Sequence, residues 1–78
     1  MSCGAVAAAS NYWVLIGARI RQKRKRAKLT QEVVAEKAGL HPNYFGRVER
    51  GEESASVEAL RQIAKALGVR MRELVWDI

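Results

Sequence analysis

Planar and charged side chains gather in one short segment of the chain: Asn43, Tyr44, Arg47 and Arg50. An arginine guanidinium can donate two hydrogen bonds to O6 and N7 of guanine, and an asparagine amide can pair similarly with N6 and N7 of adenine. A tyrosine can stack on a neighbouring group or bond a phosphate through its hydroxyl. These residue types are suited to contacting the bases and phosphates of double-stranded DNA.

Each of these side chains also has a structural interpretation that the sequence leaves open. Arg47 could contact phosphate alone, Asn43 could cap a helix locally, and Tyr44 could pack on a neighbouring loop. His41 is better suited to capping a helix, or to lying near a phosphate, than to reading a base.

Two short helices around a tight turn are predicted to position this segment. Thr30 can accept a hydrogen bond from an unpaired backbone N–H, so a helix is expected to begin after it. Gly39 suits the left-handed conformation that ends a helix. His41 then starts the second helix, and Pro42 fits its first turn, where a missing N–H costs nothing.

In each of the two helices, the apolar residues indicate which face is buried. Val33, Val34, Ala35 and Ala38 give the first helix one apolar side. Phe45 and Val48 lie three positions apart and are expected in the core. The outward face of the second helix is then made of Asn43, Tyr44, Gly46, Arg47 and Arg50. A helix-turn-helix over about residues 30–50 with such a surface is typical of a helix that enters the DNA major groove.

A longer helix is predicted before this motif, from about Tyr12 to Lys28. Ile16, Ile20 and Ala27 share one of its faces, and Arg24 is in register with them. Arg24 should therefore point partly inward, where a buried charge needs a partner.

Positive charge is concentrated in the second half of that helix. The chain has 14 lysines and arginines against 8 acidic residues, a net charge of +6. The cluster comprises Arg19, Arg21, Lys23, Arg24, Lys25, Arg26 and Lys28. It could be a solvated helix face, a nuclear-localisation-like run, or, in its C-terminal half with Lys25 and Lys28, a patch that neutralises phosphates.

The remaining chain predicts two more helices and a surface for self-association. Ser56 caps a helix from Val57 to Leu67, and a short helix follows from Met71 to Trp76. No strand alternation occurs, so the expected fold is all-α with five helices: a flexible tail at residues 1–11, then one domain at 12–78. Excess apolar residues at the C-terminus, Val75, Trp76 and Ile78, favour a homodimer. The alternative is that Trp76 folds back onto its own core.

Several functional classes are disfavoured by what the sequence contains. The single cysteine, Cys3, allows no disulfide within a monomer and fits a reducing cytoplasm. One histidine and one cysteine make no metal-ligand set, and neither a catalytic constellation nor a glycine-rich phosphate loop is evident. We therefore expect no enzyme, no cofactor and no small-molecule effector. We also expect no membrane span, although a membrane-surface helix at residues 5–28 is an alternative.

The chain resembles the Cro/C1-type, or XRE-type, helix-turn-helix domain over about Ile16 to Leu74. After an arginine-rich first helix, the matching segments are LTQ at 29–31, Ala35, AGL at 38–40, VERG at 48–51, SVEAL at 56–60, IAKALGV at 63–69 and EL at 73–74. The resemblance implies a compact, lambda-repressor-like domain that binds a pseudo-palindromic operator as a homodimer. The chain is similar to restriction–modification controller proteins and short phage repressors. The alternative is an antitoxin or protein-binding adaptor with the same fold.

Residue roles follow from this resemblance by position. Gln31 and Arg50 are expected to contact the DNA backbone, and Gln31 is also expected to brace the recognition helix. Arg24 and Glu49 are expected to form an internal ion pair. The positions facing base edges or flanking phosphates are His41, Pro42, Asn43, Tyr44 and Arg47.

Two features depart from the family pattern. Pro42 stands where many relatives have a long polar side chain. Glu52 and Glu53 stand where several have basic residues. These glutamates would repel DNA or turn toward Arg50.

Overall fold

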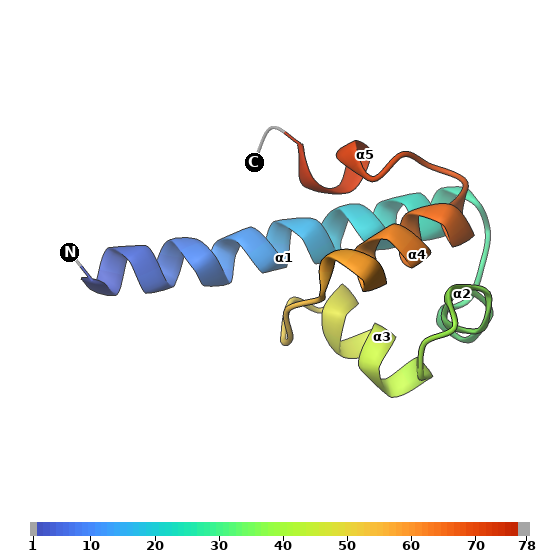
Figure 1. Ribbon diagram of the computed structural model, residues 1–78, viewed down its shortest axis with the longest axis horizontal. Coiled ribbons are helices and arrows are strands. Elements are labelled where there is room, and N and C mark those ends of the chain that lie inside the picture. The colour runs from blue at the N-terminus through green and yellow to red at the C-terminus, as the bar shows by residue number, and fades with distance from the viewer. Residues whose placement is uncertain (1, 77–78) are drawn as a thin grey trace.

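Five α-helices and no strand are found in the computed structural model, which describes the backbone of residues 2–76 and the side chains of residues 12–76 (Figure 1). The helices are α1 (Ser2–Arg26), α2 (Gln31–Ala38), α3 (Pro42–Glu49), α4 (Val57–Leu67) and α5 (Arg72–Val75). The predicted all-α, five-helix architecture is thus confirmed. Helices α2 and α3 lie on one side of α1, and α5 lies on the other (Figure 1).

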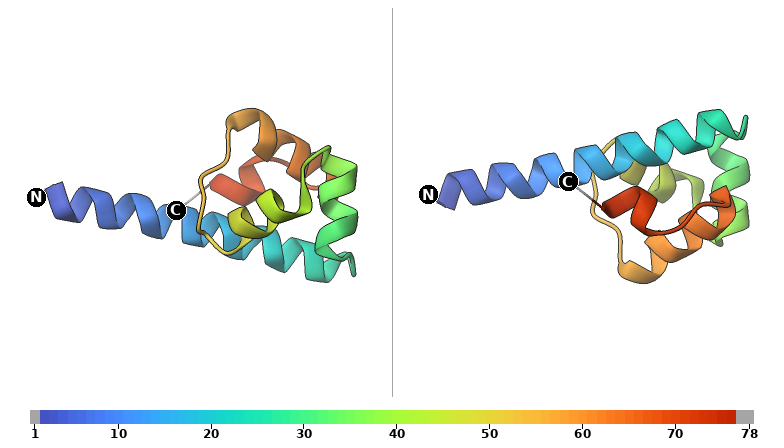
Figure 2. Two further views of the ribbon diagram at one scale, coloured as in Figure 1. Left: turned by 90° about the horizontal axis from the view of Figure 1, so that it is seen from below. Right: turned by 90° about the horizontal axis from the view of Figure 1, so that it is seen from above.

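Helix α1 is longer than the sequence predicted. It begins at Ser2 rather than near Tyr12, and ends at Arg26 rather than Lys28. Its first turns extend away from the other helices in both views of Figure 2. Within the described residues, no helix is both long and apolar enough to cross a membrane. The helix boundary is therefore corrected, while flexibility of residues 1–11 in solution stays a prediction.

The predicted helix ends of the central motif are found at the expected residues. The Thr30 hydroxyl oxygen accepts a hydrogen bond from the Val33 N–H at 3.2 Å. Gly39 ends α2 with φ of 71°, a conformation that side-chain-bearing residues rarely adopt. Ser56 caps α4 through the Ala59 N–H. The last helix is shorter than predicted, covering Arg72–Val75 rather than Met71–Trp76.

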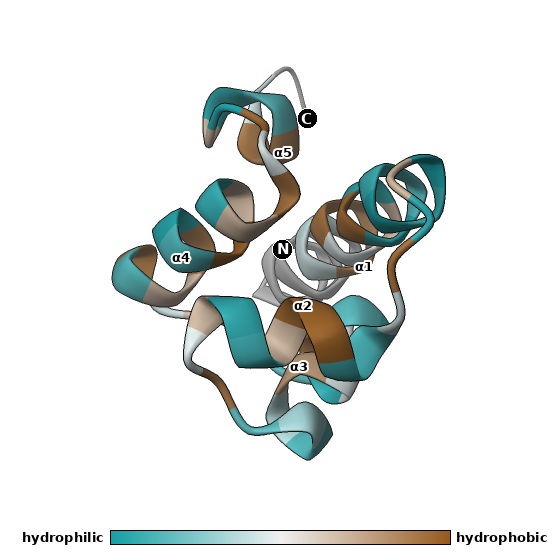
Figure 3. Ribbon diagram, turned by 90° about the vertical axis from the view of Figure 1, so that its right-hand side faces the viewer, coloured by the Kyte–Doolittle hydropathy of each residue, from teal (hydrophilic) through white to brown (hydrophobic). Residues whose placement is uncertain are grey.

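One hydrophobic core joins all five helices. Its largest fully buried side chains are Ile16, Ile20, Val34, Phe45, Val48, Ile63 and Leu74. Figure 3 shows hydrophobic residues of α1 and α4 facing the space between these helices. Ala27 is exposed, contrary to the prediction, because α1 ends before it and its register is lost.

The crossing of α1 and α3 sets where α3 lies. Gly17 of α1 is buried so close to the end of α3 that a Cβ atom there would be 2.4 Å from the Glu49 carbonyl oxygen. The Val48 carbonyl oxygen would be 2.7 Å from the same atom. Only glycine allows this approach, since real Cβ contacts are longer. Backbone contact therefore fixes the C-terminal end of α3 against α1.

Candidate nucleic-acid interface

Helix α3 separates buried and exposed residues on its two sides. Phe45 and Val48 are fully buried, as predicted. Pro42, Asn43 and Arg47 are exposed. Gly46 is buried, contrary to the predicted outward position. A Cβ on Gly46 would lie 3.2 Å from Nη1 of Arg50, so the Arg50 side chain covers it.

A buried polar network, made of Arg24, Gln31 and Glu49, attaches α3 to the rest of the domain. Arg24 Nε donates to Glu49 Oε2 at 2.6 Å, and Arg24 Nη2 donates to Oε1 at 3.1 Å. Gln31 Nε2 also donates to Oε1, at 2.7 Å. The structure therefore brings Arg24 and Glu49 together where the resemblance implies an ion pair.

The network also reaches the turn before α2, because Arg24 Nη1 donates to the Leu29 carbonyl oxygen at 2.9 Å. The side chains of Arg24 and Glu49 are only 13% and 2% exposed. The hydrogen bonds to Glu49 raise the pKa of Arg24 above its ordinary value, so the arginine stays charged. Among the described residues, no buried side-chain nitrogen or oxygen atom lacks a hydrogen-bond partner.

Two proposed base-facing residues make local contacts within the protein. His41 caps α3, because its Nδ1 accepts a hydrogen bond from the Asn43 N–H at 3.1 Å. Tyr44 is half-buried against the core, and its hydroxyl donates to the Ser54 carbonyl oxygen at 3.5 Å. The alternatives of capping by His41 and loop packing by Tyr44 are the arrangements found. Their roles at DNA stay predictions.

Both exposed arginines of the α3 region are paired with glutamates of the following loop. Arg47 Nε donates to Glu53 Oε1 at 2.7 Å. Arg50 donates through Nε and Nη2 to Glu52, at 3.0 and 3.3 Å. The sequence allowed for glutamates turning toward Arg50, and only Glu52 does so.

These side chains border a polar groove on the outer side of α3. Its volume is about 220 Å³, and its lining is Gln31, Pro42, Asn43, Gly46, Arg47, Arg50 and Glu52. Hydrogen bonding to Arg50 lowers the pKa of Glu52 below its usual 4.5, so this carboxylate remains ionised at neutral pH. The groove thus carries both positive and negative groups.

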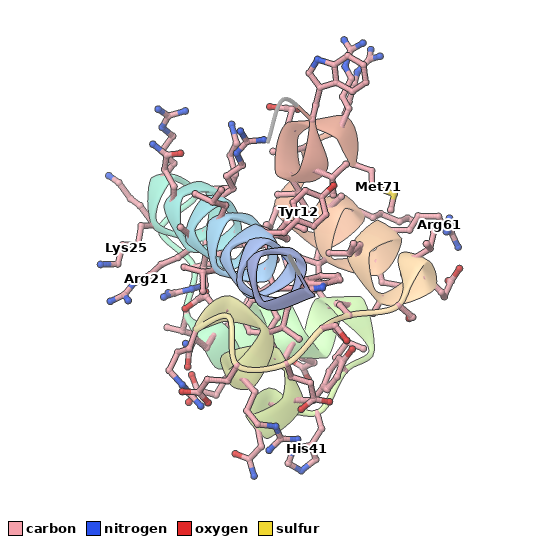
Figure 4. All side chains as sticks on the ribbon, turned by 90° about the vertical axis from the view of Figure 1, so that its left-hand side faces the viewer. Tyr12, Arg21, Lys25, His41, Arg61 and Met71 are labelled. Carbon is pink, nitrogen blue, oxygen red and sulfur yellow. The ribbon has the colours of Figure 1, made fainter. Side chains whose placement is uncertain are left out.

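The remaining phosphate candidates differ in accessibility. Lys25 and Lys28 are exposed, whereas Gln31 is half-buried and already bonded to Glu49. Figure 4 shows Arg21 and Lys25 on the flank of α1 that faces away from α4 and α5, with His41 at the α3 side of the molecule. Lys25 therefore lies beside the α3 surface rather than on it.

The C-terminal residues only partly match the predicted association surface. Trp76 is 72% exposed, so it does not fold back onto the core. Val75 is half-buried against the core, and Ile78 lies outside the described residues. The Trp76 carbonyl oxygen accepts a hydrogen bond from Arg19 Nη1. Further exposed apolar side chains lie on α1, at Tyr12, Val14 and Leu15.

Sequence reasoning missed two contacts that position α3, the close approach at Gly17 and the Arg47–Glu53 pair. Gly17 could have been found, because a glycine inside a helical pattern usually has a packing reason. The Arg47–Glu53 pair depends on side-chain directions that periodicity does not give. The Gln31–Glu49 hydrogen bond lies where the resemblance implies that Gln31 braces the recognition helix.

Comparison with known proteins adds a family and several relatives. Residues 20–74 match the helix-turn-helix family model. The chain is 34% identical over 67 residues to the control protein C.BamHI of Bacillus amyloliquefaciens, covering 85% of this chain and 83% of that protein. It is 40% identical over 62 residues to the immunity repressor protein of Bacillus phage phi105, covering 80% of this chain and 43% of the repressor.

A solved structure shares both fold and sequence. The restriction-modification controller protein C.AhdI from Aeromonas hydrophila superimposes with a TM-score of 0.78 at 39% sequence identity. The match covers 80% of this chain and 94% of that chain. The likeness therefore extends well beyond the central motif.

Proposed function

Because this chain belongs to the helix-turn-helix family, we propose that it binds double-stranded DNA sequence-specifically and regulates transcription. The observation that carries the proposal is the division of α3, whose Phe45, Val48 and Glu49 are buried while Asn43 and Arg47 are exposed. A helix that exposes hydrogen-bonding side chains on one face, and is packed against the domain through its other face, is suited to the major groove. The protein acts by binding in the cytoplasm, with no catalytic step.

The proposed form on DNA is a homodimer at a pseudo-palindromic operator. Two copies related by a twofold axis would place two α3 helices about 34 Å apart, one turn of DNA. Exposed apolar side chains on α1 and at Trp76 support self-association. Similarity to two controller proteins and a phage repressor supports a restriction–modification controller or phage-type repressor.

The central test is selection of bound duplexes from random DNA by the full chain. We expect a recurrent, roughly palindromic site with guanine at the position contacted by Arg47. Arg47→Ala should cost about 1–3 kcal/mol of binding free energy at that site and relax preference there.

A matched variant separates base reading from phosphate binding. Lys25→Ala should weaken binding to all duplexes alike and reduce the dependence of affinity on salt. If the wild-type protein binds random DNA as tightly as every selected site, sequence-specific regulation is refuted.

A further inference from the structure

The Arg47–Glu53 pair leaves the base-reading end of the arginine open. Glu53 accepts from Nε, at 2.7 Å. Among the side chains that the structure describes, none accepts a hydrogen bond from the terminal nitrogens Nη1 and Nη2 of Arg47. A guanidinium held at Nε can still approach the O6 and N7 atoms of guanine with both terminal nitrogens.

In Arg50, by contrast, the bonded edge of the guanidinium includes a terminal nitrogen. It donates to Glu52 through both Nε and Nη2, at 3.0 and 3.3 Å, and its Nη1 lies over Gly46. This arrangement occupies one of the two terminal nitrogens that an end-on contact with guanine O6 and N7 uses. Of these two arginines, Arg47 is therefore the one whose terminal nitrogens can both donate to the edge of a base.

The loop that carries Glu53 is fixed on both sides of that residue. The Glu52 N–H donates to the Arg47 carbonyl oxygen at 2.9 Å. A Cβ on Gly51 would lie 2.7 Å from Cα of Val14, so this glycine packs directly on α1. After Glu53, the Ser54 carbonyl oxygen accepts from the Tyr44 hydroxyl. Glu53 is therefore held beside α3.

A carboxylate in this place changes the balance between phosphate and base contacts. Sequence-independent affinity comes from cationic side chains that neutralise phosphates. The Glu53 carboxylate offsets the positive charge of Arg47 locally and leaves N–H donors for neutral acceptors such as guanine O6 and N7. We propose that Glu53 is a positioning and specificity-determining residue, which directs Arg47 toward guanine and suppresses its contact with phosphate. This inference rests on the proposed DNA-binding function.

The test is Glu53→Gln, which removes the charge and keeps the shape of the side chain. Affinity for random duplexes should rise about 3- to 10-fold at low salt, with a steeper salt dependence by about one phosphate contact. Affinity for the selected site should rise less, so the ratio of specific to random affinity falls. In an Arg47→Ala background, Glu53→Gln should leave the guanine preference unchanged, since Glu53 acts through Arg47.

The matched control is Glu58→Gln. Glu58 is an exposed glutamate of α4 that pairs with Arg61, and its substitution changes the net charge by the same amount. If both variants raise random binding equally, or if Glu53→Gln leaves the specificity ratio unchanged, the inference is overturned while DNA binding stands. If the wild-type protein selects no sequence at all, the proposed function itself fails, and the inference with it.

Discussion

At the scale of single residues, Glu49 is the charged residue on which the position of α3 depends. Burying a carboxylate costs several kcal/mol unless hydrogen bonds compensate for lost water. Glu49, side chain and backbone together, is 5% exposed. Its carboxylate accepts three hydrogen bonds, two from Arg24 and one from Gln31. These bonds connect the ends of α1 and α3 with the beginning of α2.

Replacing Arg24 with methionine should therefore destabilise the fold strongly. Arg24→Met leaves Glu49 buried without its cation, and we expect the free energy of unfolding to fall by about 3 kcal/mol. Urea unfolding followed by circular dichroism measures this loss.

Arg61→Met is the control for that measurement, because both side chains of the Arg61–Glu58 pair are exposed. Exposed pairs contribute little, so its unfolding midpoint should stay near that of the wild type. A loss below about 1 kcal/mol for Arg24→Met would show that the buried network does not hold α3 in place.

The sequence predicted individual positions better than individual pairs. The register of Arg24 with Ile16 and Ile20 indicated that it points inward, and helical spacing placed Phe45 and Val48 in the core. The identity of Arg24's partner came only through family resemblance. The Glu53 contact was missed because it depends on the conformation of an irregular loop, which periodicity does not describe.

At the scale of helices, the α1–α3 crossing limits which substitutions α1 tolerates. Gly17→Ala would place a methyl group 2.4 Å from the Glu49 carbonyl oxygen. Overpacking of this kind costs about 1–3 kcal/mol, more than the gain of roughly 0.5–1 kcal/mol in helix propensity. We expect a net loss of thermal stability and weaker DNA binding, since α3 must shift.

The adjacent Ala18→Gly serves as the control, because Ala18 is exposed on the same helix. It should cost only the propensity difference and leave DNA binding unchanged. Equal effects of both substitutions on binding would argue against a role for the close crossing.

Helix α5 is attached through Glu73, and this contact makes stability depend on pH. The Arg70 N–H donates to Glu73 Oε2 at 2.8 Å, and Lys23 Nζ lies 3.3 Å from Oε1. These contacts lower the pKa of Glu73 below its usual 4.5. The stabilising contribution is thus complete above pH 4.5 and is lost as pH falls through the lowered pKa in the folded state.

Glu73→Gln should accordingly reduce the melting temperature at pH 7, and its melting temperature should converge with that of the wild type as the pH falls below the lowered pKa of Glu73. Melting curves at several pH values test this expectation. Glu36→Gln makes the same substitution on the exposed surface of α2 and is the control, with a melting temperature expected near that of the wild type at pH 7. A constant difference between wild type and Glu73→Gln across this range would contradict the assignment.

Helix ends were predictable where a side chain or a glycine marks them. Thr30, Gly39 and Ser56 all occupy the expected caps, and α4 ends at Leu67 as predicted. The start of α1 was wrong because residues 1–10 lack a core-facing pattern, although alanine is the strongest helix former. Alanine propensity favours a helix in this segment even without such a pattern.

At the scale of the whole molecule, exposed apolar residues form the surface that we propose for self-association. Tyr12 and Trp76 are 41% and 72% exposed, and α5 packs on α1. A tryptophan at the centre of an interface commonly contributes about 2 kcal/mol or more. Trp76→Ala should therefore raise the dimer dissociation constant roughly 30-fold, as measured by sedimentation at micromolar concentrations.

Val57→Ala controls for the loss of any exposed apolar side chain, since Val57 is 71% exposed on α4. Its association should match the wild type. If wild type and Trp76→Ala are both monomeric, the proposed interface is wrong. The sequence indicated the excess of apolar residues at this end, but not which of them remain exposed once α5 has packed.

The two-sided character of α3 has a consequence for how DNA preference can diverge among related proteins. Residues that hold the helix, such as Val48 and Glu49, are buried, whereas Asn43 and Arg47 are exposed. Substitutions at the exposed positions can therefore accumulate with little penalty to folding. Preference for a new operator can be acquired by substituting a few exposed residues. The same separation makes α3 a practical starting point for engineering regulators that do not bind one another's operators.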